Sequence, residues 1–183
     1  MRDFCLKENK ILLLLALNIA ILIYACANIN ISYDEAKVFF SHSSFLRKHG
    51  FLHELTGLSV STFGEILGID FALRIPFLCA HLINLYLFYL LSLKILNNQN
   101  DSILSVAIFM FLPGVLASAV LVNNAVFIIM LSLGALLCVS NKHFKTLIFL
   151  LTLSIFISNA FITLYLALFF YALYSKNRAY SVL

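Results

Sequence analysis

Long, mostly apolar runs of residues constrain the fold of this chain more than any other feature. A helix needs about 20 apolar residues to cross the hydrocarbon core of a membrane. Backbone polar groups in lipid must bond within the protein, so such runs favour helices. The chain contains five of these runs, at 11–29, 71–93, 103–122, 125–139 and 146–174. The sequence therefore predicts an all-α, polytopic membrane helix bundle that forms one domain over residues 1–183.

The number of spans depends on how the last run is interpreted. Residues 146–174 are too many for one ordinary span, and the polar residues of Ser158-Asn159-Ala160 interrupt them. We favour two short helices, 146–157 and 161–174, over one long tilted helix. The run at 103–122 carries Pro113-Gly114 near its middle and is counted as one span, and 11–29 is treated as one uninterrupted span. The prediction is thus five or six spans.

Composition supports a membrane protein and excludes other classes. The chain is 63% hydrophobic and 11% charged, whereas a soluble domain is typically about 45–50% apolar and about 25% charged. So few charges also argue against a disordered chain. The net charge of +4 is spread along the sequence without a basic run, so no nucleic-acid partner is expected.

Basic residues between the runs predict the orientation of the spans. Eight Lys and Arg residues fall on one side if the N terminus is cytoplasmic: Arg2, Lys7, Lys10, Lys94, Lys142, Lys145, Lys176 and Arg178. The positive-inside rule then puts both termini in the cytoplasm. We expect the membrane to be a cell membrane of the bacterial inner type. The long loop at 30–70 faces outside. Ala25-Cys26-Ala27 resembles a signal-peptide cleavage site, but the apolar stretch exceeds a usual signal core, which favours an uncleaved anchor.

The outer loop begins with a helix-start pattern. Ser32 and Glu35 fit a capping box, in which each side chain bonds a backbone N–H near the other. Apolar residues at helical spacing follow as far as Gly50, which predicts an amphipathic helix at the outer membrane surface. In this interpretation Asp34 and Glu35 only stabilise the helix start. The alternative is that they are catalytic.

Three histidines also lie in the outer loop. His42, His49 and His53 are seven and four residues apart, spacings that can align imidazoles on one helical face for a metal. Gly50 interrupts the predicted helix between the last two, and no established zinc motif is present. We therefore expect histidines in contact with solvent, and no metal site.

Arg74 is the most costly residue to bury, because it carries a charge just inside the second span. Asp70, one helical turn earlier, offers an ion pair. A lipid phosphate is the alternative partner, since guanidinium binds phosphate well. His81 and Asn84 follow on roughly the same face, which predicts that this face lines the bundle interior or a wet cavity.

Taken together, the motifs resemble a known family. The pattern consists of Tyr33-Asp34-Glu35-Ala36 after the first span, Ala72-Leu73-Arg74-Ile75-Pro76 opening the second, and Pro113 in the third. It resembles the amino-terminal part of C-superfamily membrane glycosyltransferases of the protein mannosyltransferase and aminoarabinose transferase type. The resemblance covers nearly the whole chain but less than half of a typical family member.

The resemblance implies an enzyme that moves a sugar from a polyprenyl-phosphate carrier to an acceptor on the outer face of the membrane, with inversion. Asp34 would be the catalytic carboxylate, supported by Glu35. Arg74 would stabilise the departing lipid phosphate, and His81 and Asn84 would complete the substrate-binding set. Membrane lipid and the polyprenyl-phosphate sugar are the implied partners.

The chain departs from the family pattern at two positions. Asn123-Asn124 replaces an acid found in many members. Amide oxygens supply no charge, which argues against a divalent cation. Ser158-Asn159-Ala160 stands where many members have a lysine. The resemblance also implies later spans and an outer carboxy-terminal domain, which residues 1–183 are not expected to include. Two other functions therefore stay open: a non-catalytic subunit or truncated remnant that associates with a partner membrane protein, and a small transporter.

Overall fold

The computed structural model describes residues 2–30, 32, 50–157, 166–167 and 170, with side chains in the first helix described from Leu13 onward. All regular elements among these residues are helices, which confirms the predicted all-α class for the described part. They are α1 (Arg2–Asn28), α3 (Gly50–Leu67), α4 (Ile69–Leu96), α5 (Gln99–Met110), α6 (Pro113–Val120), α7 (Ala125–Ser140) and α8 (Phe144–Ile157).

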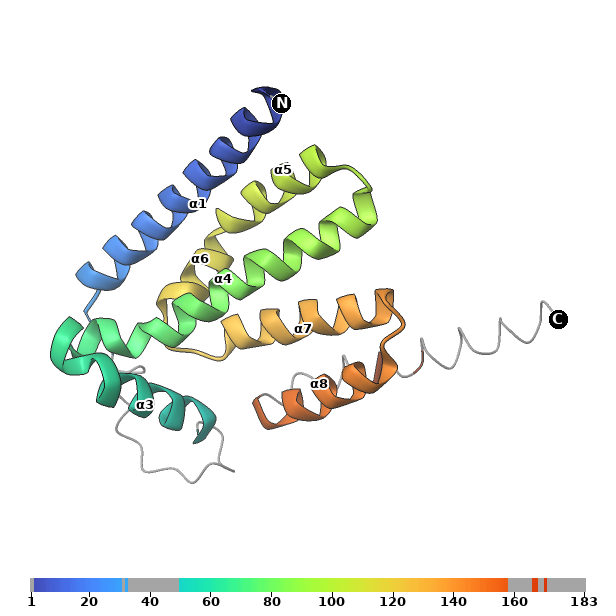
Figure 1. The fold of residues 1–183 in the computed structure, drawn as a ribbon. Helices are drawn as coiled ribbons and strands as arrows, with labels where there is room; N and C mark the ends of the chain where they lie inside the picture. Colours follow the sequence, from blue (N-terminus) through green and yellow to red (C-terminus); the bar gives the residue numbers. More distant parts are fainter. Residues whose placement is uncertain (1, 31, 33–49, 158–165, 168–169, 171–183) are drawn as a thin grey trace.

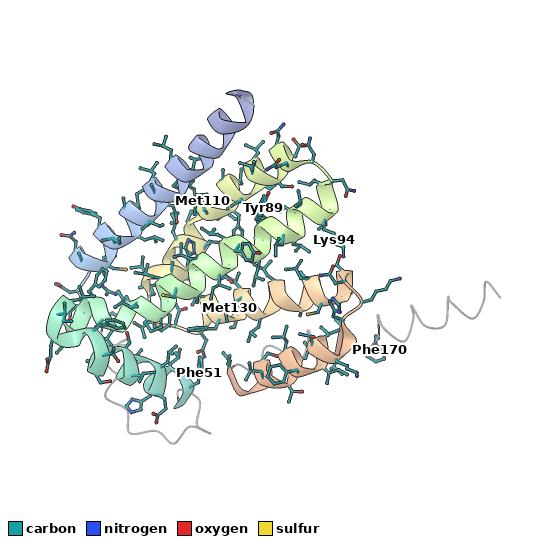
Figure 2. The ribbon with its side chains drawn as sticks, in the orientation of Figure 1. Phe51, Tyr89, Lys94, Met110, Met130 and Phe170 are labelled. Atoms are coloured by element: carbon teal, nitrogen blue, oxygen red, sulfur yellow. The ribbon has the colours of Figure 1, made fainter. Side chains whose placement is uncertain are left out.

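The helix α4 is the centre of the arrangement and contacts α1, α3, α5, α6 and α7, while α8 packs on α7 (Figure 1). Successive long elements run back and forth, so their ends gather at two places. At one, which we call the Lys94 end, Lys94 Nζ donates to the carbonyl of Ser140 at 2.6 Å and to Asn141 Oδ1 (Figure 2). At the other, the α3 end, Asn124 Nδ2 donates to the carbonyl of Ile157 at 3.1 Å.

The helix α3 packs on the bundle near the first turn of α7 and the last turn of α8. It turns back onto α4 at Gly68, whose φ of 85° suits glycine. Leu52 belongs to one buried cluster with Phe127 and Ile157, and the rings of Phe51 and Phe127 meet edge to face with centroids 5.4 Å apart. This helix was not predicted, and its described bounds begin at Gly50, where the preceding amphipathic helix was expected to end. That predicted helix falls largely on residues outside those described.

One described helix, α4, is long and apolar enough to cross a membrane. The pair α5 and α6 would add a second if it counts as one span, although its two parts are bent by 62°. The shorter apolar helices are Leu13–Asn28, Ala125–Ser140 and Lys145–Ser154. Helix α8 covers the whole of the predicted span 146–157, and the predicted turn at 158–160 lies outside the described residues. The described part of the chain thus supports membrane association through one or two helices.

The predicted continuous span at 103–122 is wrong in one respect, because the helix breaks at Phe111–Leu112. Pro113 has no N–H to donate, and it disfavours helical backbone at the residue before it. Leu112 accordingly has extended backbone, with φ −61° and ψ 128°. Pro113 then becomes a first-turn residue of α6, where a missing N–H costs nothing.

Candidate functional site

Arg74 joins the start of α4 to the end of α1. Its side chain is fully buried. Nη1 donates to the carbonyl of Cys26 at 2.8 Å and to that of Ile29, and Nη2 donates to the carbonyl of Asn30 at 3.3 Å. The last carbonyls of a helix lack intrahelical donors and carry partial negative charge, so a cation is favourable there.

The predicted ion pair between Arg74 and Asp70 can be compared with these contacts. Asp70 is exposed, and among the described residues it forms no ion pair with Arg74. The predicted ion pair is therefore wrong. Its physical reason is that the carbonyls at the end of α1 offer buried acceptors, whereas an exposed carboxylate keeps its hydration.

His81 lies deeper in the bundle and bonds to a residue that sequence reasoning missed. Its Nε2 is 3.2 Å from Oδ1 of Asn18 on α1, and Asn18 Nδ2 donates to the carbonyl of Met110 at 3.2 Å. All of these side-chain groups are buried. The Met110 carbonyl is the last of α5, so Asn18 supplies a donor at the break before α6. Asn18 sits within the run 11–29, and a polar residue there signals a partner in the bundle.

Asn84 connects α4 to α7. Its Nδ2 donates to the carbonyl of Val126 at 2.9 Å, and its side chain is fully buried. Arg74, His81 and Asn84 therefore share the buried side of α4, but they do not meet at one point. At about 1.5 Å per residue, His81 lies about 10 Å and Asn84 about 15 Å along the helix from Arg74.

The predicted catalytic pair, Asp34 and Glu35, lies outside the described residues, as do His42 and His49. In the sequence Asp34 follows the Arg74-bound Asn30 by four residues. His53 lies on α3.

The Asn123-Asn124 pair starts α7. Asn123 Oδ1 accepts a hydrogen bond from the backbone N–H of Ala125 at 2.8 Å, and Asn124 Nδ2 donates to the carbonyl of Ile157. Both contacts are those of a helix junction.

Two apolar grooves border α1 and α4 and share Leu82. The larger, of about 370 Å³, lies between α1, α4 and α5. The smaller, of about 230 Å³, runs from Leu82 toward Phe71 near the α3 end. Together they form an apolar path along the α1 side of α4.

Comparison with protein-family models, curated proteins and solved structures finds no match for this chain. The family resemblance of the sequence motifs therefore stays a prediction.

Proposed function

We propose that the chain is a membrane glycosyltransferase, or the amino-terminal portion of one, that moves a sugar from a polyprenyl-phosphate carrier to an acceptor on the outer face of a bacterial inner membrane. The proposal includes five or six spans with both termini in the cytoplasm. The back-and-forth course of the described helices supports this topology. Lys94, Lys142 and Lys145 lie near the Lys94 end, which would then be cytoplasmic, with the α3 end outside.

One observation carries the functional proposal: Arg74 binds the carbonyl of Cys26 in the last turn of α1 and those of Ile29 and Asn30 just after it. In the sequence, Tyr33-Asp34-Glu35 follows Asn30 by three to five residues. A fixed positive charge near a carboxylate and a phosphate suits transfer chemistry, since it stabilises negative charge on the leaving phosphate.

In the proposed reaction Asp34 accepts the proton of the acceptor hydroxyl, supported by Glu35. The hydroxyl oxygen forms a bond to the anomeric carbon from the face opposite the phosphate. The bond between the anomeric carbon and the phosphate oxygen breaks, and the lipid phosphate leaves with the electron pair. Inversion follows from this single displacement. The Arg74 guanidinium acts through its field and by holding the segment that carries Asp34.

The groove along α1 and α4 supports a lipid-linked donor. Its part near Phe71 starts within one helical turn of Arg74, and the larger part continues toward Gln99. An isoprenoid tail along this path would leave its phosphate near Arg74. His81 and Asn84 are fully buried and bonded to Asn18 and to the Val126 carbonyl. For this reason the structure lends no support to a transporter with these residues in an open cavity.

The experiment that tests the proposal compares Asp34→Asn with Asp70→Asn, a matched change of an exposed acid at the same end. Each purified chain is placed in proteoliposomes with a panel of tritiated polyprenyl-phosphate sugars, and transfer to acceptor is measured. General-base catalysis typically contributes about 10²–10⁴ in rate. We therefore expect Asp34→Asn to lose at least about 100-fold, while Asp70→Asn keeps wild-type transfer.

Photo-crosslinking with a reactive polyprenyl-phosphate analogue measures donor binding separately from sugar transfer. Labelling that natural polyprenyl phosphate competes away supports the donor site. Equal transfer by both variants would exclude Asp34 as the base. A folded chain with neither labelling nor transfer would leave a non-catalytic membrane subunit as the function.

A further inference from the structure

The charged side chains of the described residues are divided between the two ends of the bundle. Three of the four described lysine and arginine side chains are exposed at the Lys94 end: Lys94, Lys142 and Lys145. The fourth, Arg74, is buried. At the α3 end the exposed charges are instead acidic, namely those of Glu54, Glu65 and Asp70. The described surface is therefore cationic at one end and anionic at the other.

Lys94 ties the end of α4 to the turn between α7 and α8, which carries the other two lysines. Its Nζ donates to the carbonyl of Ser140 at 2.6 Å and to Asn141 Oδ1 (Figure 2). These bonds place the Lys94 ammonium group beside the residue that precedes Lys142 in the chain. An ammonium group has three N–H donors, and two of them are used here. The three lysines thus lie around one turn.

Lys142 has a backbone conformation that favours glycine. Its φ is 60°, in the left-handed region that is unfavourable for a residue with a Cβ. Glycine is common at such positions after a helix. The turn is held by backbone hydrogen bonds, from the N–H of Lys142 to the carbonyl of Val139 at 3.1 Å and from that of His143 to the carbonyl of Cys138 at 2.9 Å. A lysine offers the backbone no advantage here, so its charge is the property that needs an explanation.

The three lysines have no counter-ion within the described part of the chain. Lys94, Lys142 and Lys145 form no ion pair with a described residue. Asp101 is the described acid at this end, and its carboxylate accepts a hydrogen bond from Nδ2 of Asn98 at 2.8 Å at the start of α5. Because like charges on one surface repel each other, an external anion would stabilise this surface.

We propose that the three lysines of the Lys94 end bind the phosphate groups of anionic phospholipids in the membrane leaflet at that end. Helix α4 is long and apolar enough to cross a membrane, and Lys94 lies in its last turn. When α4 spans the membrane, the ammonium groups lie at the depth of the lipid headgroups. Each lysine near an anionic lipid surface adds about fivefold in affinity. The proposal rests on membrane association and not on sugar transfer, which is proposed for the opposite end.

Native mass spectrometry of the full-length chain in detergent tests the proposal. The chain is titrated with an equimolar mixture of phosphatidylglycerol, which is anionic, and phosphatidylcholine, which has no net charge, and the retained lipids are identified by mass. We expect the wild type to retain phosphatidylglycerol in preference, and this preference to fall as ammonium acetate is raised, because exposed charges are screened by salt. Equal retention of the two lipids by the wild-type chain would overturn the proposal.

Lys142→Gly is the most informative variant, since it removes a charge and supplies the residue that the local φ favours. We expect it to resist SDS unfolding at least as well as the wild type, while its preference for phosphatidylglycerol falls about fivefold. Adding Lys145→Gln should lower the preference about fivefold again. A folded double variant with the wild-type preference would contradict the proposal.

The control makes the same change of net charge at the other end. Ser61→Glu with Thr62→Glu adds two negative charges at exposed positions of α3, and we expect it to keep the wild-type preference. An equal fall in both double variants would show that net charge, and not the lysine surface, selects the lipid. A polyglutamate peptide that binds more tightly than phosphatidylglycerol, and loses binding in the lysine variants, would assign the surface to an acidic protein segment and overturn the lipid proposal.

Discussion

Helix α4 and the pair α5–α6 respond differently to the same residue. Both are apolar segments that contain one proline. Helix α4 continues through Pro76 for a total of 28 residues. The chain from Gln99 to Val120 instead breaks before Pro113 and bends by 62°.

The two segments differ in the group that replaces the missing proline N–H. In each segment the carbonyl four residues before the proline loses its helical donor. Pro76 cannot donate to the carbonyl of Ala72, one turn earlier. In the structure the hydroxyl of Ser59 on α3 donates to that carbonyl, and the helix goes on.

At the break, the N–H of Leu112 donates to the carbonyl of Phe109 at 3.2 Å in a tighter turn, and Asn18 donates to the carbonyl of Met110. These two hydrogen bonds satisfy the carbonyls of Phe109 and Met110 in the bent arrangement. We infer that the outcome at each proline depends on where a replacement donor lies, because a buried carbonyl left without a donor is costly.

The largest effect is expected for Asn18→Leu. This change removes the donor to the Met110 carbonyl and the acceptor for His81 Nε2. Two buried groups are left without a partner, and each costs about 1–3 kcal/mol, so we expect a loss of about 2–6 kcal/mol in the free energy of unfolding. Unfolding in mixed micelles with increasing SDS measures it.

Asn28→Leu serves as the matched control, since it changes an exposed asparagine on the same helix, and we expect a change within about 0.5 kcal/mol. Equal losses of unfolding free energy in the two variants would mean that the hydrogen bonds of Asn18 do not stabilise the break between α5 and α6.

Most helices could be predicted because apolar runs and polar boundaries define them. The run 71–93 corresponds to α4 at Ile69–Leu96, and 125–139 corresponds to α7 at Ala125–Ser140. The helix α3 could not be predicted in this way. Its glycines, serines and threonines give neither a long apolar run nor strong helix propensity. Its stability comes from packing on Phe127 and Ile157, which are distant in sequence.

The candidate site was predictable in type but not in its contacts. The cost of polar groups in lipid predicts that Arg74, His81 and Asn84 face the interior, and all three are buried. Their partners include backbone carbonyls of other helices. Every residue has a carbonyl, so residue types and spacing cannot tell which one is used. Asn18 carried a detectable signal, because it is an amide near the middle of an apolar span.

An intermediate effect is expected for Ser59→Ala. The Ala72 carbonyl then has neither the hydroxyl of Ser59 nor an N–H from Pro76. We expect a loss of about 1–2 kcal/mol in the free energy of unfolding, because a buried acceptor is left unsatisfied. In Pro76→Ala the new N–H can bond the Ala72 carbonyl, so adding Ser59→Ala to that variant should cost at least about 0.5 kcal/mol less than it does alone.

A double-mutant cycle in the same SDS titration measures this coupling. Ser61→Ala is the control, since Ser61 is exposed and bonds within α3. Strict additivity of Ser59→Ala and Pro76→Ala would show that Ser59 is not the substitute donor.

The smallest effect is expected for Gly114→Ala, which tests another explanation of the difference. Pro113 is followed by glycine, whereas Pro76 is followed by Phe77, so the glycine itself could cause the break. A Cβ at Gly114 meets no atom within 4 Å, and its φ is not positive. We therefore expect a gain of about 0.5 kcal/mol, from reduced freedom of the unfolded chain, with no change in the bend.

Two measurements decide between proline and glycine as the cause. Stability is compared with that of Gly57→Ala on α3, where an added Cβ also meets nothing within 4 Å and a similar small gain is expected. The bend is followed by the distance between spin labels at exposed Leu104 on α5 and Ala117 on α6. A gain in both variants with an unchanged distance assigns the break to Pro113 and its donors. A loss confined to Gly114→Ala, or a straightened pair, would assign it to the glycine and remove the contrast with Pro76.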